Sequence, residues 1–259
     1  MLERPRSPLK GKPLRNPGQS LDEEIQRVID DQLTGPYIGV VMLWAMAGVE
    51  WFGYLRNMPR RPWLLSMAAA IGTVWLAWNV IRSRKRVRRL RQGRDGERAV
   101  GQFLEGLRES GARIFHDVPG DGFNLDHVVI STHGIYVIET KTISKPGPDA
   151  KVVFDGERIT VAGHRPDRNP VAQATAEADW LRRTLATSTG RTLPVRGVVV
   201  YPGWWIEQVH RERRRDVWVL EPKALPGFIE HEPPVIAPDD VALAAFHLSR
   251  YVRSDNSSG

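Results

Sequence analysis

The chain has 259 residues, of which 41% are apolar and 26% charged, and this balance excludes a protein that is disordered throughout. It contains no cysteine, so disulfide scaffolds and cysteine-ligated zinc are excluded. Its net charge of +7 is unevenly spread, because residues 1–94 carry 17 Lys and Arg against 7 Asp and Glu, whereas residues 95–259 carry 20 against 23. The basic character therefore belongs to the N-terminal third, and the remainder is slightly acidic.

Residues 1–35 are expected to form a cytoplasmic N-terminal tail. Residues 1–20 mix Pro, Gly, Arg and Lys without hydrophobic periodicity, which is typical of a mobile segment. Apolar residues recur at helical spacing from Leu21 to Leu33 and favour a short helix there. No secretory signal peptide is expected, because the first apolar segment starts too late in the chain.

Two apolar segments follow within residues 36–81. Residues 36–55 contain one charge, Glu50, and residues 63–81 contain none. Each is long enough to cross a hydrocarbon core of roughly 30 Å at about 1.5 Å per residue. We predict a two-helix transmembrane hairpin with Ala68, Ala69 and Gly72 at the helix contact. A buried helical hairpin of a soluble protein is the alternative.

Residues 82–92 are expected to form a basic juxtamembrane linker. They carry seven Lys and Arg, whereas the short loop between the apolar segments carries Arg56, Arg60 and Arg61. Because cytoplasmic flanks are the more basic ones, both termini are expected in the cytoplasm and Asn57 outside, in a multi-pass protein of the cell membrane. Such a run can also contact anionic lipid or nucleic acid.

Residues 93–220 alternate between helical and strand patterns, which predicts an α/β domain. Residues 221–259 are expected to add a C-terminal helix and, from Ser254, a disordered tail. The expected helices cover residues 94–107, 170–185 and 238–252, and the expected strands cover 113–116, 126–130, 135–141, 152–154, 159–161, 196–201 and 217–220. Trp204, Trp205 and the basic run 211–215 are expected in an exposed loop that can stack on bases, with a solvated charge run as the alternative.

Residues 125–141 read as a β-hairpin with a polar turn that ends at Gly134. If Ile130 pairs with Ile135, the same register places Asp126 opposite Glu139. Opposed carboxylates, with Cβ atoms roughly 5 Å apart, repel each other unless a cation lies between them. Side chains alternate along a strand, so Lys141 shares the face of Glu139. Three charged groups therefore converge on one side of the hairpin.

This constellation, with Glu139-Thr140-Lys141 as its second half, resembles the PD-(D/E)xK nuclease superfamily. The surrounding residues resemble the nuclease-related domain (NERD) family over residues 93–220. The resemblance implies a restriction-endonuclease-like mixed sheet flanked by helices. The residues that carry it are Gly93-Arg94-Asp95-Gly96-Glu97, Asp126-His127-Val128-Val129, the run from Gly134 to Lys141, and Asn169-Pro170 followed by Gln173.

The expected site has Asp126, Glu139, Lys141 and Gln173 as catalytic residues. Asp126 and Glu139 would hold Mg²⁺ or Mn²⁺, since hard carboxylate oxygens suit these ions. The resemblance implies that Glu97 assists the metal site and that Gln173 approaches the hairpin. The alternatives are a surface glutamate at position 97, a solvated Gln173, and a surface ion pair of Lys141 with Glu139.

Two functions remain open at this point. The first is a membrane-anchored, divalent-metal-dependent nuclease at the cytoplasmic face, for which DNA is favoured over RNA as substrate. The second is a non-catalytic module of the same fold that binds nucleic acid or a protein at the membrane. The lipid bilayer is a partner in both, and the oligomeric state stays open.

Overall fold

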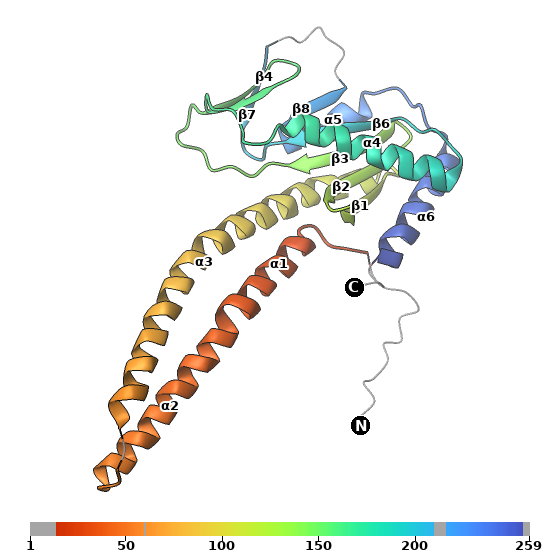
Figure 1. The fold of residues 1–259 in the computed structure, drawn as a ribbon. Helices are drawn as coiled ribbons and strands as arrows, with labels where there is room; N and C mark the ends of the chain where they lie inside the picture. Colours follow the sequence, from red (N-terminus) through yellow and green to blue (C-terminus); the bar gives the residue numbers. More distant parts are fainter. Residues whose placement is uncertain (1–13, 60, 210–215, 256–259) are drawn as a thin grey trace. The chain divides into compact units, whose positions relative to one another are not determined.

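A computed structural model describes residues 14–59, 61–209 and 216–255 (Figure 1). The chain divides into two compact units, a helical unit from Ser20 to Gln92 and an α/β unit made of Met1–Gln19 together with Gly93–Gly259.

The helical unit is a hairpin of long helices. Helix α1 (Gln19–Ile29) passes through a π-helical turn (Asp30–Thr34) into α2 (Gly35–Leu55) without a break. The helix expected at residues 21–33 therefore exists but is continuous with the first apolar segment. Pro36 lies directly after the π-helical turn, and its missing N–H interrupts the helical hydrogen bonds at this point. Helix α3 (Pro62–Glu105) runs back alongside (Figure 1).

Small residues and hydroxyl groups line the contact between α2 and α3. A Cβ added to Gly72 would lie 3.3 Å from Val40 Cγ2, and Ala69 is fully buried, as the predicted small-residue contact requires. Ala68, in contrast, is exposed. Trp44 Nε1 donates to Thr73 Oγ1 over 3.0 Å, and Trp51 Nε1 donates to Ser66 Oγ over 2.9 Å. The pairs 44 with 73 and 51 with 66 establish an antiparallel hairpin.

The outer surface of this hairpin is apolar. Two helices, Gln19–Leu55 and Pro62–Arg108, are long and apolar enough to cross a membrane, and only 17% and 6% of their most apolar stretches are buried. A core helix of a soluble protein would bury most of that stretch, so the alternative of a buried hairpin does not fit the described residues. Exposed side chains include Ile38, Met42, Trp44, Val49, Phe52, Met67, Ile71, Val74, Trp75 and Ile81.

The basic segment 82–92 is helical. It lies within α3, whereas the sequence suggested a linker between the second apolar segment and the α/β unit. Arginine and lysine are good helix formers, so a run of them extends a helix that apolar residues have begun.

The α/β unit is built on a five-stranded mixed sheet, as predicted. Its order is β1-β2-β3-β6-β8. The first three strands pair antiparallel, while β3, β6 and β8 pair parallel. The strands are β1 (Arg113–Pro119), β2 (Asn124–Ser131), β3 (Gly134–Thr140), β6 (Val195–Val200) and β8 (Val217–Leu220).

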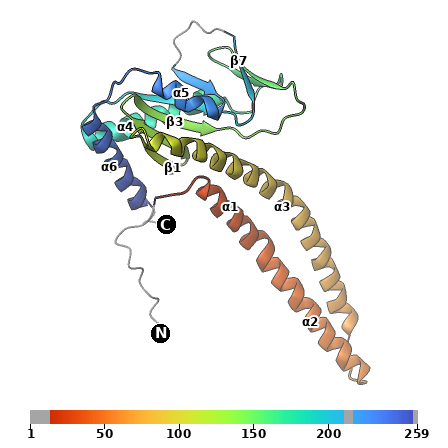
Figure 2. The same ribbon diagram turned by 180° about the vertical axis from the view of Figure 1, so that it is seen from behind.

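Helices cover both faces of this sheet. Helices α4 (Pro170–Thr189) and α6 (Pro238–Asp255) pack on one face, and the last turns of α3 with α5 (Leu225–Glu230) pack on the other (Figures 1 and 2). Val100 and Leu104 of α3 and Leu107 in the 3-10 turn after it (Gly106–Arg108) are buried, whereas Phe103 is exposed. Helix α6 shares the core of α4, so the chain beyond residue 220 completes the α/β unit. Ser254 and Asp255 were expected in a disordered tail but belong to α6, and 256–259 lie outside the described residues.

A second sheet of three strands has the order β5-β4-β7. The predicted hairpin of β4 (Lys151–Phe154) and β5 (Ile159–Val161) is confirmed, whereas β7 (Trp205–Gln208) was not predicted. The expected exposed aromatic loop is wrong for Trp204, which is 2% exposed. Trp205 is 71% exposed as expected, but it lies in strand β7 and not in a loop. The basic run 211–215 lies outside the described residues.

Candidate active site

The register of the β2–β3 hairpin is the predicted one. Ile130 pairs with Ile135, and the ladder continues to His127 and Ile138. Asp126 is the next residue of β2 beyond this last pair, and its Oδ2 accepts a 2.7 Å hydrogen bond from the backbone N–H of Thr140. The Asp126 carboxylate therefore lies across the end of β3, beside Glu139.

The side chains of Glu139, Lys141 and Gln173 meet at this edge. Lys141 Nζ donates to Glu139 Oε1 over 2.5 Å and to Gln173 Oε1 over 2.9 Å. Gln173 Nε2 in turn donates to Glu177 Oε1 over 2.8 Å. Glu139 and Glu177 are buried, so neither the alternative of a solvated Gln173 nor that of a simple surface ion pair describes this contact.

Helix α4 brings Gln173 to the hairpin because its start is fixed locally. Asn169 Oδ1 caps the helix by accepting from Val171 N over 3.0 Å, and Pro170 occupies the first turn. The helix then lies close against β6, since a Cβ on Gly197 would come within 2.6 Å of Ala174 O. The cap and this close approach place the first turn of α4 at the edge of the sheet where Lys141 lies.

Glu97 reaches the site from α3 on the opposite face of the sheet. It is 7% exposed, which excludes the alternative of a surface glutamate. Burial raises the pKa of Glu97 to about 8, with further contributions from Asp117 and Glu139, while a hydrogen bond from the backbone of Gly18 lowers it. Residue 96 must be small here, since a Cβ on Gly96 would lie 1.8 Å from Thr142 Oγ1.

The carboxylates of the site repel one another. Burial of its carboxyl group, followed by the charges of Glu139 and Glu97, holds the pKa of Asp126 well above its usual range. The residue as a whole is half-buried. Burial and then Glu139 raise the pKa of Glu177 to about 8. Carboxylates in a low-dielectric setting resist joint ionisation, and a nearby cation relieves that cost.

Two neighbours of the site were not predicted from the sequence. Glu177 is 3% exposed, and its Oε2 has no hydrogen-bond partner among the described residues. Tyr201 directly follows β6, which is parallel to β3, and burial and then Glu139 raise the pKa of its hydroxyl. The available signals were the four-residue spacing of Glu177 from Gln173 and the position of Tyr201 at the carboxyl end of a buried strand.

The donor set suits a hard divalent cation chemically, because it consists of buried carboxylates with raised pKa values and one carboxylate oxygen without a partner. The side-chain positions are not those of a closed metal cage. Within the part of the chain that the structure describes, no three His, Cys, Asp or Glu side chains are grouped to hold a metal ion. The carboxylate ligands are of the type that Mg²⁺ or Mn²⁺ prefers. In the described side-chain positions, however, Glu139 Oε1 is bound to Lys141 Nζ.

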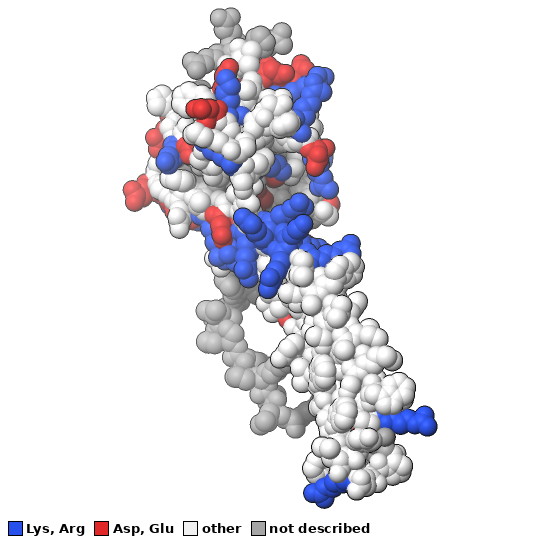
Figure 3. Space-filling model, turned by 90° about the vertical axis from the view of Figure 1, so that its left-hand side faces the viewer, with Lys and Arg blue, Asp and Glu red and all other residues white. Residues whose placement is uncertain are grey.

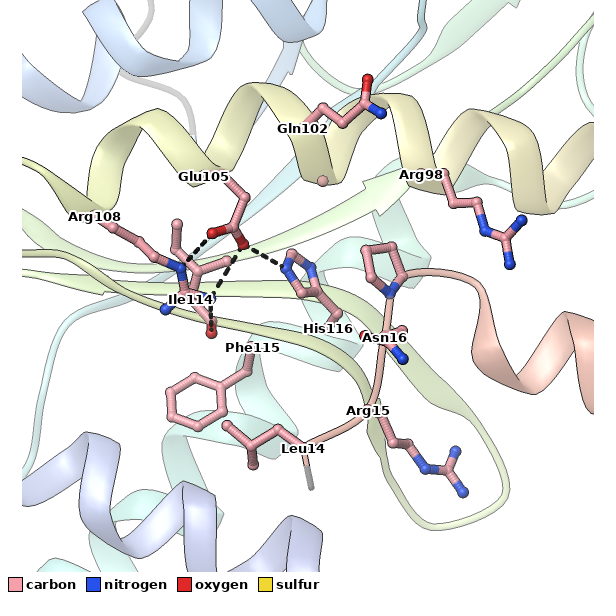
Figure 4. A pocket seen from close by; sticks show the side chains of 12 residues that line it. Leu14, Arg15, Asn16, Arg98, Gln102, Glu105, Arg108, Ile114, Phe115 and His116 are labelled. Atoms are coloured by element: carbon pink, nitrogen blue, oxygen red, sulfur yellow. Dashed lines mark hydrogen bonds and ion pairs between the residues drawn. The ribbon is translucent and has the colours of Figure 1, made fainter. Parts of the chain in front are cut away.

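A separate cavity of about 410 Å³ lies between residues 14–17, α3 and β1 (Figure 4). Glu105 Oε1 contacts His116 Nε2 at 3.1 Å, and His116 Nδ1 contacts His127 Nδ1 at 2.8 Å. His127 therefore turns toward β1, in keeping with a structural role. Residues 14–17 were expected in a mobile tail, but Arg15 Nη1 lies 3.1 Å from Asp117 Oδ2.

No curated protein and no solved structure matches the chain. Residues 92–202 match the model of the nuclease-related domain family. The matched segment contains Glu97, the whole β2–β3 hairpin and helix α4. It therefore includes every side chain described above at the site. The chain therefore carries a nuclease-related domain, NERD, of the PD-(D/E)xK nuclease-like superfamily.

Proposed function

We propose that this protein is a membrane-anchored nuclease that depends on a divalent metal and hydrolyses phosphodiester bonds of nucleic acid, with DNA favoured over RNA. The observation that carries the proposal is the meeting of Asp126, Glu139 and Lys141 at one end of the hairpin, inside the matched domain. Glu97 and Gln173 support it, because they approach the same point from helices on the two faces of the sheet.

Each residue has a distinct part in this proposal. Asp126 and Glu139, with Glu97, would hold Mg²⁺ or Mn²⁺, which would supply a water of lowered pKa and neutralise charge on the phosphate. Lys141 donates hydrogen bonds from Nζ to the phosphate oxygens or to the attacking water, and so stabilises the charge that develops. Gln173 is a positioning residue, because its Oε1 holds Nζ at 2.9 Å.

The helical unit would serve as the anchor. Its two helices expose apolar side chains from Tyr37 to Leu55 and from Trp63 to Ile81, as a surface in contact with lipid does. Seven basic residues in segment 82–92 outnumber Arg56, Arg60 and Arg61 in the connecting loop. By this asymmetry the nuclease-related domain and both termini face the cytoplasm, in a multi-pass protein of the cell membrane.

The second candidate is a non-catalytic module of the same fold that binds nucleic acid or a protein at the membrane. The chain of hydrogen bonds from Glu139 through Lys141 and Gln173 to Glu177 favours it, because the site is closed on itself without a ligand. A catalytic site needs an N–H of Lys141 directed at the phosphate or the attacking water when the cation binds. A binding module has no such requirement.

The full-length protein, purified in detergent, decides between the two. It is incubated with end-labelled single- and double-stranded DNA and RNA in Mg²⁺, Mn²⁺, Ca²⁺ or EDTA. Cleavage in Mg²⁺ or Mn²⁺ that stops in EDTA, and that Asp126→Asn abolishes, supports the nuclease. Nucleic acid binding without cleavage in any of these ions, unaffected by Asp126→Asn, supports the binding module.

A further inference from the structure

A cavity of about 420 Å³ lies within the helical unit, between the π-helical turn (Asp30–Thr34) and the middle of α3. Four of its lining residues are basic, and Gln32 and Asn79 add polar amides. The basic residues are Arg82, Lys85, Arg86 and Arg89. The cavity thus offers hydrogen-bond donors and positive charge, which is the chemistry of an anion site.

The basic lining occupies one face of α3. Positions 82, 85, 86 and 89 are separated by three, four and seven residues, a spacing that places side chains together on a helix. Arg84, Arg88 and Arg91 belong to the same basic run but point to the other side by the same geometry, and none of them lines the cavity. Figure 3 shows the dense group of basic side chains at the end of the apolar helical surface.

The local contacts leave this face with excess positive charge. Arg86 Nη2 lies 2.8 Å from Glu24 Oε1, and the Arg82 guanidinium lies over the Trp78 ring at 5.3 Å from its centre. Lys85 and Arg89 have no ion pair among the described residues. Such a cluster is relieved by a bound anion.

The floor of the cavity is ordered by a buried hydroxyl group. Ser83 is 6% exposed, and its Oγ donates to Gln32 Oε1 over 3.0 Å. This bond joins the π-helical turn to α3 and fixes the Gln32 amide beside the basic face. The cavity is therefore bounded by two elements rather than being an open strip of a single helix.

Its place along the helix identifies the kind of anion. The last residue of the apolar run is Ile81, and the basic face starts at Arg82. At about 1.5 Å per residue, Arg82 to Arg89 spans roughly 10 Å, enough to cross a headgroup layer of roughly 5–8 Å beside the hydrocarbon core. Trp78 lies one turn before, where interfacial aromatic side chains occur. Basic pockets between helices at this level suit lipid phosphates.

We propose that this cavity binds the phosphate of an anionic phospholipid headgroup in the cytoplasmic leaflet. The proposal rests on the membrane anchoring described under the proposed function. Arg82, Lys85 and Arg89 supply the charge for the phosphate, and Gln32 and Asn79 supply neutral hydrogen bonds. The ligand is the headgroup phosphate held at the membrane surface, as distinct from free phosphate or the backbone of a nucleic acid.

The test uses the full chain in a neutral detergent. Its melting temperature is measured while short-chain phosphatidylglycerol, short-chain phosphatidylcholine or inorganic phosphate is added. The pocket variant is Arg82→Gln/Lys85→Gln/Arg89→Gln, and the matched control is Arg84→Gln/Arg88→Gln/Arg91→Gln, which removes the same charge from the other side of the same helix.

Phosphatidylglycerol should raise the melting temperature of the wild type and of the control. The apparent affinity should fall on the order of a hundredfold in the pocket variant, at about one kcal/mol for each basic residue near the surface. Equal losses in both variants, or no preference for phosphatidylglycerol over phosphatidylcholine, would overturn the proposal. So would a response to inorganic phosphate equal to that of the lipid, or a pocket variant that loses affinity for DNA or RNA and keeps its lipid response.

Failure of the anchoring itself is recognised separately. Cell membranes are extracted with alkaline carbonate, and the wild type is expected in the membrane pellet. A wild type found in the supernatant would refute the anchoring and the headgroup site together. A protein that stays in the pellet but shows no dependence on the lipid headgroup would refute the headgroup site alone.

Discussion

The backbone N–H of Thr140 donates a 2.7 Å hydrogen bond to Asp126 Oδ2, and so ties the carboxylate of one strand to the residue between Glu139 and Lys141 on the next. This bond opposes the effects of burial and of Glu139, which raise the pKa of Asp126. The Asp126 and Glu139 side chains are thereby kept together although their charges repel.

The first prediction follows from this bond. In Asp126→Asn, the amide oxygen still accepts from Thr140 N while the repulsion from Glu139 is lost, so the domain should stay folded and be at least as stable without metal. Mg²⁺ or Mn²⁺ should raise the melting temperature of the wild type, since a ligand of the folded state alone stabilises it, and should leave Asp126→Asn unchanged.

The Asp126→Ala variant is the contrast in that experiment. It leaves the N–H of Thr140 without its acceptor, and a buried unsatisfied donor costs about 1–3 kcal/mol. A melting temperature for Asp126→Ala equal to that of Asp126→Asn would show that the hydrogen bond contributes nothing.

The second prediction concerns pH. The folded pKa values of Glu97 and Glu177 are raised from 4.5 to about 8, so the folded state holds protons that the unfolded state has released, and stability is lost as the pH rises through 8. The loss between about pH 7 and pH 9 should be about 1 kcal/mol for each carboxyl group in the absence of metal.

The buried histidines do not contribute to the change in stability between pH 7 and pH 9. Burial lowers the pKa values of His116 and His127 below 6.5, so both are neutral in the folded and unfolded states above pH 7 and affect stability only in more acidic solution. Thermal melts of the full chain in EDTA, at several pH values, measure the slope. Glu97→Gln should flatten it, and a wild type whose stability is flat or rises across this range would contradict the charge distribution given above.

The third prediction is steric. Gly96→Ala places a methyl group 1.8 Å from Thr142 Oγ1, so α3 or the segment after Lys141 must shift, at a cost of about 1–3 kcal/mol. Thr142→Gly should restore part of the loss in the double variant. Gly106→Ala, whose added Cβ meets nothing within 4 Å, is the control and should cost less. Equal melting temperatures for Gly96→Ala and Gly106→Ala would show that the close approach is not needed.

The fourth prediction concerns topology. The natural chain has no cysteine, so a single engineered one can be labelled cleanly. Met58→Cys is preferred to a change at Asn57, whose φ of 58° strains a cysteine. An impermeant thiol reagent should label Met58→Cys on intact cells and Ser254→Cys only after lysis. The reverse pattern would invert the proposed orientation.

Local sequence patterns predicted the hairpin register and the meeting of Asp126, Glu139 and Lys141. The polar turn that ends at Gly134 sets Ile130 opposite Ile135, and the period of two along each strand then places Asp126, Glu139 and Lys141 on one face. The start of α4 was predicted equally well, because the side chain of Asn169 caps the backbone N–H two residues later and Pro170 fits the first helical turn.

What the sequence did not predict depends on distant partners. Trp204 is buried because its Nε1 reaches the carbonyl of Ile143, and β7 exists because it pairs with β4, about fifty residues earlier. The helix through 82–92 lacks an apolar stripe, so hydrophobic periodicity gave no sign of it. Glu177 becomes part of the site only when α4 docks on β6.

The most direct test of the central claim is the initial rate at which the full-length protein cleaves labelled DNA in Mg²⁺, compared between the wild type, Lys141→Ala and Lys145→Ala. Lys145 is exposed and lies four residues from Lys141, so it controls for the loss of one positive charge. We predict that Lys141→Ala keeps its thermal response to Mg²⁺ while its rate falls roughly 10²- to 10³-fold, as when one group that stabilises the transition state is removed, and that Lys145→Ala cleaves like the wild type. A wild type that responds to Mg²⁺ but leaves DNA and RNA intact, or a Lys141→Ala protein that cleaves at the wild-type rate, would contradict a nuclease site built on Asp126, Glu139 and Lys141.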